Sequence, residues 1–418
     1  MKKMHYGWIV LASCCAMMMG NGMTLNVIGQ YFVPVTTELN LGMGQFTFYY
    51  AMRGIFLAIS LTMLNKWLER IDIRLLLTSC FLIQLICIAL MGTFTAVWQW
   101  YIAGGIMGFF LTPVYFVVPP IILSNWFIKK RGFVIGVALS FSGVGGVIMN
   151  PVVASFIINF GWRTAYLLNA IIAGVVVLPF LIFLIRKTPA DKGLKPYGYE
   201  EKQPQQGQDG AVNAAANQDQ PRGVSREDAV KSFSFVIMVV LFAACGFFAG
   251  YPQHVTAYGI SVGYSATFAS YLLSLNMLGN VVSKLAFGAI SDRFGGKVLI
   301  FTALSMIMAS FLLLLGGASY LPLLLFGSFL SGCFFSVSSV ATPLMLQSVY
   351  GLRDYARIFL LLSISQNLFV SFGPTMVGFM YDFSAGYSFP LYVGIAVTVA
   401  AAVLFCSSTA ASKKLPWR

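Results

Sequence analysis

Long apolar segments separated by short polar ones recur along the whole chain. Twelve of them approach or exceed the length of about 20 residues that a helix needs to cross the hydrocarbon core of a bilayer. In order they are 7–32, 44–65, 74–94, 97–124, 132–158, 164–185, 232–257, 266–290, 298–317, 320–348, 357–381 and 386–409. The pattern predicts an all-α membrane protein with twelve transmembrane helices. The basic start, MKKMHYGW, is similar to that of a signal peptide, but the apolar run after it is too long, so we expect an uncleaved first helix.

One long polar stretch interrupts this pattern at its centre. Residues 187–231 are rich in Gln, Asn, Pro and Gly and contain no run that could bury a core. We therefore expect a flexible linker between a six-helix bundle over residues 1–186 and a second one over residues 232–418.

The two predicted bundles share features at a nearly constant offset. Glu69–Arg70 follows the second apolar segment and Asp292–Arg293 follows the eighth, and the two acids are 223 positions apart. The turns at Gly161 and Gly386 are 225 positions apart. Agreement between the two offsets indicates a duplication, and so two pseudo-symmetric halves.

Composition and charge narrow the class of protein further. Only 9% of the residues are charged and 58% are apolar, which excludes a soluble enzyme, a nucleic-acid binder and a disordered chain. Of the 26 Lys and Arg residues, all except Arg53, Arg163 and Lys284 lie in or beside the tails, the linker and four short loops on one side of the predicted membrane. This bias predicts that those segments, both termini included, are cytoplasmic in a plasma or inner membrane. The net charge of +13 thus reflects topology, and nucleic acid is not an expected partner.

The acidic residues and the cysteines exclude further chemistry. No predicted span carries a carboxylate near its centre, although proton-coupled sugar symporters and cationic-drug exporters commonly use one. The seven cysteines lie within apolar runs, and no metal-binding, nucleophile–base or phosphate-loop motif is present. We expect no enzymatic activity, no cofactor and no metal.

Several motifs resemble those of known transporters. Residues 288–297, GAISDRFGGK, fit the loop signature G-x-x-x-D-R-x-G-x-K/R of the major facilitator superfamily. The counterpart of this loop after the second apolar segment, NKWLERIDIR, lacks both glycines. The segments YGW, NWFIKKRG, GWRTAY and HVTAYGIS look like the monocarboxylate transporter and oxalate–formate antiporter group. The resemblance implies two bundles that rock about a central site.

The signature loop has a physical role in this scheme. Gly288 would allow two helices to approach closely, and Asp292 could accept hydrogen bonds from the N-terminal end of a neighbouring helix. We expect Asp292 and Arg293, together with the basic start of the fifth helix, to latch the cytoplasmic gate. The alternative is that these residues serve only topology and folding.

Two cations lie inside predicted spans. Lys284 precedes Asp292 by eight residues, which places it about 12 Å deeper in the membrane. The resemblance places Lys284 where the group carries a substrate-binding arginine. Arg53 is about the tenth residue of the second helix and has no acid nearby in sequence. Since an unpaired buried cation is costly, both predict an anionic substrate. The alternatives are snorkelling for Lys284 and a structural role for Arg53, with hydrogen bonds to backbone carbonyls or Tyr hydroxyls.

The chain departs from this group at three positions that bear on coupling. It lacks the acid three turns before Lys284, it has Asn26 where the group has a lysine, and Gln366 and Asn367 occupy the region of a helix-11 lysine. Proton coupling is therefore open, with Lys284 and His254 as its candidates; a packed histidine is the alternative for His254.

These features predict a secondary active transporter of small organic anions, with monocarboxylates as the first class, that works by alternating access as an exchanger or a proton symporter. Its expected partners are the substrate, protons and the lipid bilayer, and we expect a monomer. The alternatives are an exporter of neutral or amphipathic solutes and a membrane anion sensor. Further candidate cavity residues, for which interhelical hydrogen bonding is the alternative, are Tyr115, Asn26, Asn276, Gln366 and Asn367.

Overall fold

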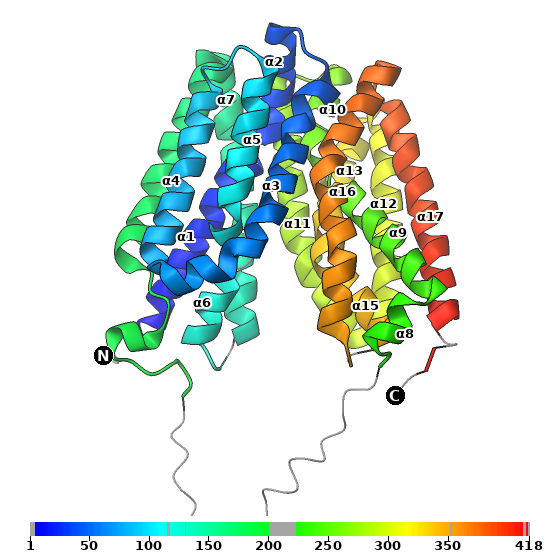
Figure 1. Ribbon diagram of the computed structural model, residues 1–418. Helices are drawn as coiled ribbons and strands as arrows, with labels where there is room; N and C mark the ends of the chain where they lie inside the picture. The colour runs from blue at the N-terminus through cyan, green and yellow to red at the C-terminus, as the bar shows by residue number, and fades with distance from the viewer. Residues whose placement is uncertain are drawn as a thin grey trace, which may run out of the picture.

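Helices in two groups make up almost all of the molecule (Figure 1). The structure is a computed structural model that describes residues 5–114, 118–129, 131–199, 223–351, 353–412 and 415–416, and this part contains no β-strand. The first group consists of α1 (Gly7–Leu25), η1 (Ile28–Tyr31), α2 (Phe32–Leu39), α3 (Met43–Arg70), α4 (Ile73–Met91), α5 (Val97–Thr112), α6 (Val118–Trp126), α7 (Arg131–Pro179) and η3 (Phe180–Leu184). Two short helices, η4 (Pro189–Lys192) and α8 (Arg226–Val230), lie between the two groups in the order of the sequence. The second group consists of α9 (Phe233–Phe248), η6 (Tyr251–His254), α10 (Val255–Ser261), α11 (Ala266–Phe294), α12 (Gly296–Gly317), α13 (Leu321–Ser331), α14 (Cys333–Ser336), η7 (Val337–Ala341), α15 (Thr342–Tyr350), α16 (Tyr355–Ser384) and α17 (Ser388–Ser412).

The predicted membrane spans correspond to these helices. Among the described residues, ten helical stretches are long and apolar enough to cross a membrane. One of them, Gly132–Leu184, contains two passes, because Gly161 has non-helical angles (φ 77°, ψ 159°) that turn the chain. Helices α5 and α6 form one more pass on either side of residues 115–117, which the structure does not describe. The prediction of twelve passes in an all-α membrane fold is therefore confirmed.

Some spans extend further than predicted. The first continues through η1 and α2 to Leu39, where Asn40 adopts a left-handed conformation (φ 51°) that ends the helix. The second continues to Arg70 rather than ending near residue 65, since a helix that leaves the apolar region can continue into polar sequence.

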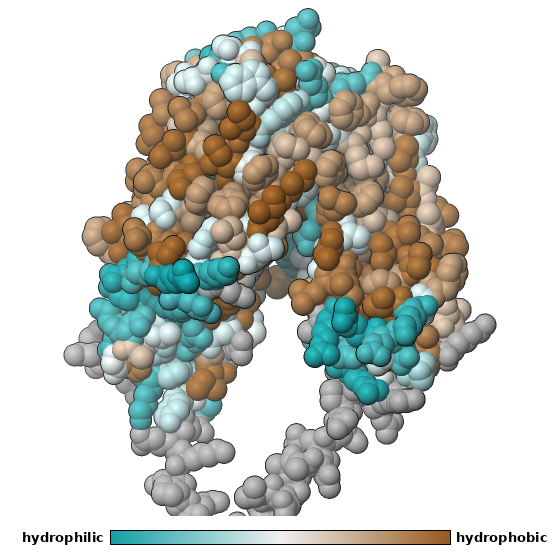
Figure 2. All heavy atoms as spheres, in the orientation of Figure 1, coloured by the Kyte–Doolittle hydropathy of each residue, from teal (hydrophilic) through white to brown (hydrophobic). Residues whose placement is uncertain are grey.

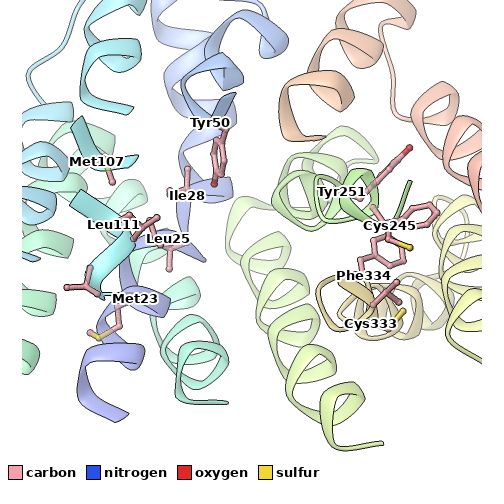
Figure 3. Close-up of a cluster of buried hydrophobic side chains, with 14 of the residues drawn as sticks. Met23, Leu25, Ile28, Tyr50, Met107, Leu111, Cys245, Tyr251, Cys333 and Phe334 are labelled. Carbon is pink, nitrogen blue, oxygen red and sulfur yellow. The ribbon is translucent and has the colours of Figure 1, made fainter. Parts of the chain in front are cut away.

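Apolar side chains occupy both the outer surface and the interior of each half. Large side chains such as Leu75 and Phe183 are more than 60% exposed, and Figure 2 shows hydrophobic residues over most of the visible flank, as expected for a surface that faces lipid. Inside, Figure 3 shows buried side chains from both halves, among them Leu25, Leu111 and Phe334. The buried core thus draws on both halves.

The halves meet along two helix pairs at the end of the molecule away from the linker. Helix α3 packs against α16, where a Cβ atom on Gly44 would lie 2.5 Å from the Phe379 ring and one on Gly54 would lie 1.8 Å from Ser371 Oγ. Helix α7 packs against α11, where a Cβ atom on Gly143 would lie 2.5 Å from Val281 Cγ2. We call these pairs the α3–α16 seam and the α7–α11 seam. Their glycines let the helix backbones approach more closely than larger residues would allow.

On the linker side the halves are apart. Figure 2 shows the molecule hollowed between them at this end. A Cβ atom on Gly136 of α7, or on Gly288 of α11, would meet no atom within 4 Å. The structure is therefore closed on the side away from the linker and open on the linker side.

We expect Gly143→Leu to destabilise this state, because the new side chain would collide with α11 where the seam is tightest. Distances between spin labels at the linker-side ends of α7 and α11 should shift toward shorter values as the closed side is forced open. Gly136→Leu is the matched control, since it lies two turns away on the same face of α7 and has free space. Equal distance distributions in the two variants would show that glycine packing does not hold the seam.

Candidate functional site

Arg53 lies at the linker-side end of the α3–α16 seam, directly before Gly54. Its guanidinium carbon is 4.2 Å from the centre of the Tyr50 ring, one turn earlier on the same face of α3. The Nη1 atom is buried and has no hydrogen-bond partner among the described residues. The helix spacing therefore places the cation on an aromatic platform, while one of its strongest donors remains unsatisfied.

Lys284 occupies the corresponding end of the α7–α11 seam. Met277, Val281 and Lys284 follow one face of α11, and the first two of these contact glycines of α7. Lys284 is one turn closer to the linker side and is partly buried. In the described part of the chain it has no hydrogen-bond or ion-pair partner. Both cations thus lie where the seams end and the hollow begins.

The other polar residues predicted to line the cavity make hydrogen bonds within one half. The Asn26 amide donates to the Ser142 carbonyl at 2.9 Å, and Asn276 donates to Ser331 Oγ at 2.6 Å. Gln366 donates to the Ser338 carbonyl at 2.7 Å, and Asn367, which is exposed, donates to a carbonyl of its own helix. The contacts of Asn26, Asn276 and Gln366 fit the interhelical alternative, whereas that of Asn367 lies within α16. Tyr115 lies outside the described residues.

The predicted gate latch is not engaged in this state. Asp292 is exposed and has no hydrogen bond or ion pair to any described residue, and Arg293 lies against the Phe294 ring with its guanidinium carbon 5.2 Å from the ring centre. The free space around Gly288 agrees with this, since the linker-side ends of the halves are apart. A latch that closes this side would form only in the opposite state, so its role stays a prediction.

His254 is packed on the closed side. Its Nδ1 atom lies 3.0 Å from the Tyr387 hydroxyl and its Nε2 atom lies 2.8 Å from the Pro374 carbonyl, so both ring nitrogens have partners in the C-terminal half. The Phe32 ring of the other half makes an edge contact with the imidazole. The histidine is therefore part of the interface between the halves rather than of the open hollow.

Hydrogen bonds between the halves were missed by the sequence reasoning, and one acceptor among them is a carboxylate. Asp382 of α16 accepts hydrogen bonds from the backbone amides of Met43 (2.8 Å) and Gly44 (2.7 Å), the first two residues of α3. The residue before them, Gly42, has no side chain to cap this helix. The carboxylate of one half therefore caps a helix of the other, at the end where the helix dipole favours negative charge. The sequence contains a signal only for the missing cap and not for its distant replacement.

The described part of the chain offers no group of three His, Cys, Asp or Glu side chains that could hold a metal ion. Arg53 and Lys284 are the two cations that the described spans place beside the seams. This arrangement can attract and orient a small anion.

Comparison with known families agrees with the two-half architecture. The model of the Major Facilitator Superfamily matches residues 10–273 and 240–417. The chain belongs to the major facilitator superfamily. It is a membrane transporter of this type, and this family does not consist of enzymes.

Curated relatives of this transporter are distant. The glucose-6-phosphate exchanger SLC37A2 of Xenopus tropicalis is 23% identical over 68% of this chain and 62% of its own length. Monocarboxylate transporter 12-B of Danio rerio is 24% identical over 40% of this chain and 37% of its own length. The putative glycerol-3-phosphate transporter 5 of Arabidopsis thaliana is 26% identical over 43% of this chain and 40% of its own length. The aligned part of the chain thus spans less than two thirds of each of these relatives.

Solved structures of other transporters have the same fold. The nucleoside transporter NupG superposes with a TM-score of 0.70 at 14% identity, over 99% of this chain and 100% of that one. A TM-score of 0.65 at 16% identity is found for a bacterial homologue of the human lysosomal transporter Spinster in an inward-facing and unoccupied conformation. This superposition covers 99% of this chain and 98% of that one. At these identities the likeness shows the fold alone.

We expect Asp382→Asn to weaken the closed side of this transporter by about 1 kcal/mol, because a neutral amide is a poorer cap for the amides of α3. The population open on the linker side should fall about fivefold relative to the opposite state, as measured with the same spin-label pair.

The control is Glu38→Gln. Glu38 is also exposed at this end and pairs with Arg163 at 3.1 Å, but both residues belong to the N-terminal half. A shift of the same size in the control variant would mean that loss of surface charge, and not loss of the cap between the halves, changes the equilibrium.

Proposed function

We propose that this protein transports small organic anions by alternating access, with Arg53 and Lys284 as the groups that bind the negative charge. Monocarboxylates are the first substrate class, and transport proceeds by exchange or by proton symport. The observation that carries the proposal is the buried, unpartnered Nη1 of Arg53 at the closed end of the hollow.

An unsatisfied buried guanidinium donor is costly, and an anion is the natural partner for it. The Tyr50 ring supports the guanidinium from one side and leaves its donor edge available to a ligand. A carboxylate accepts two parallel hydrogen bonds from this group, which would orient as well as bind it.

The position of Lys284 adds support from the other half. Each cation lies beside the glycine contact of its seam that is nearest the linker side. For Arg53 this is the contact of Gly54 with Ser371, and for Lys284 it is the contact of Gly143 with Val281. The two cations thus come from different bundles, as we expect of a site that lies between such repeats.

The names of the relatives point to the same charge class. A glucose-6-phosphate exchanger, a glycerol-3-phosphate transporter and a monocarboxylate transporter share an anionic group in their named substrates. These names leave two anion chemistries, carboxylates and phosphate esters, which the assay below separates.

We further propose that the linker side is cytoplasmic, as the distribution of Lys and Arg predicts, so that this state is open to the cytoplasm. The protein would act as a monomer in the plasma or inner membrane, with residues 1–186 and 232–418 as its two bundles and 187–231 as the linker. The latch at Asp292, Arg293 and Gly288 would close the cytoplasmic side in the opposite state.

Counterflow in proteoliposomes tests the site. We expect labelled monocarboxylate to exchange in the wild type, and Arg53→Ala and Lys284→Ala each to lose at least about tenfold in transport efficiency, as removal of a charge partner from a desolvated site does. Parallel assays with phosphate esters and with a nucleoside define the substrate class.

The matched control is Lys231→Ala, which removes an exposed cation on the linker side. Retained anion flux in both site variants would refute the site. Flux of neutral solutes alone would favour the exporter, and binding of anions without flux would favour a sensor.

A second variant at the same position tests proton coupling. Lys284→Arg keeps the positive charge but holds its proton throughout the working pH range. We expect it to bind anion while losing any alkalinisation that accompanies uptake in the wild type. His254→Gln should keep the coupling, since His254 lies in the closed interface. Loss of alkalinisation in His254→Gln but not in Lys284→Arg would assign the proton to His254.

A further inference from the structure

A polar pocket lies on the linker side of the N-terminal half, away from the hollow between the halves. It has a volume of about 480 Å³ and is lined by the turn between α3 and α4 and by the segment that follows η3. The Lys187 ammonium donates to the Leu68 carbonyl at 2.6 Å, which fixes the second segment beneath the end of α3. The pocket is therefore built from two parts of the chain that are more than 100 residues apart.

Positive charge in this pocket exceeds what its own acids neutralise. Four basic side chains line it, namely Arg70, Arg74, Arg186 and Lys187, against three acidic ones, namely Glu69, Asp72 and Asp191. Two of the acids are already engaged: Asp72 pairs with Arg74 at 3.5 Å and caps α4, and Asp191 accepts hydrogen bonds from Thr188. Although burial opposes ionisation, these hydrogen bonds hold the pKa of Asp191 below its usual value.

The remaining cations of the pocket form no ion pair with a carboxylate of the described residues, although Arg186 is near enough to Asp191 to help to lower the pKa of that carboxyl. Arg186 donates only to the carbonyls of Phe183 and Ile185, and Lys187 donates to that of Leu68. Within the described residues, neither they nor Arg70 form an ion pair. They are left to bind an anion from outside the chain.

Apolar surface adjoins the pocket on both of its walls. Leu75 follows Arg74 on α4 and is 64% exposed, and Phe183 precedes Arg186 by three residues and is 68% exposed. Figure 2 shows hydrophilic residues gathered at the linker-side end of the N-terminal half, directly against a hydrophobic flank. A ligand that fits this boundary has an anionic head and an apolar tail.

We propose that this pocket binds the phosphate headgroup of an anionic phospholipid from the linker-side leaflet. The cations Arg70, Arg186 and Lys187 contact the phosphate, and the acyl chains lie along Leu75 and Phe183. This site is separate from Arg53 and Lys284 and does not depend on which solute the protein transports. Bilayers supply such lipids at the depth where cationic side chains end a helix.

The test uses the full chain in detergent, with retention of phosphatidylglycerol measured by native mass spectrometry against phosphatidylcholine and inorganic phosphate. We expect preferential retention of phosphatidylglycerol by the wild type. Arg70→Gln should weaken the binding about fivefold, as expected for one cation near an anionic headgroup. Glu69→Gln should strengthen it, an outcome that misfolding cannot produce.

Lys231→Gln, which removes an exposed cation at the end of the linker beside the second bundle, is the control and should bind as the wild type does. Equal retention of phosphatidylglycerol and phosphatidylcholine, or equal retention by Arg70→Gln and Glu69→Gln, would overturn the proposal. Occupancy by inorganic phosphate that excludes phosphatidylglycerol would also overturn it, in favour of a soluble anion. Failure of the anion-transport assay would leave these outcomes unaffected.

Discussion

The close approach of helix backbones across the two seams is the constraint on which this state depends. Where Gly54 and Gly143 lie, a single Cβ atom would already overlap the opposite half. Because packed interfaces tolerate little change in volume, the halves either meet there or separate. The hollow on the linker side is the consequence of closure at the other end, and the ends of the seams define its closed end.

Asp382 adds an electrostatic component to this closure. Glycine packing is short-ranged and gives no preference for one register of α3 against α16. The two hydrogen bonds that Met43 and Gly44 donate to the Asp382 carboxylate favour a single register. The same amides must find water or another acceptor when this side opens. Packing and capping thus fail together, which favours two discrete states over a continuous range.

Much of the architecture could be predicted from the sequence, because membrane spans need only length and apolar composition. Arg53 and Lys284 stand out in the sequence as well, since a cation in an apolar run is conspicuous, and their role stays a prediction. Partners far apart in the chain could not be predicted: nothing in the sequence pairs Asp382 with the amides of Met43 and Gly44 that it caps. The amides of Asn26, Asn276 and Gln366 look alike in sequence whether they face a cavity or a neighbouring helix, and only the fold provides Ser142, Ser331 and Ser338 as their acceptors.

The position of the two cations bears on how the proposed transport would be coupled. Groups at the end of a seam change their surroundings most when the halves rock, and Arg53 and Lys284 belong to different halves. Closing the linker side around an empty site would confine two positive charges in a medium that screens them poorly, a cost that a bound anion removes. An empty carrier would therefore return more slowly than a loaded one. At the proposed site, this difference in rate favours exchange of anions over their net movement.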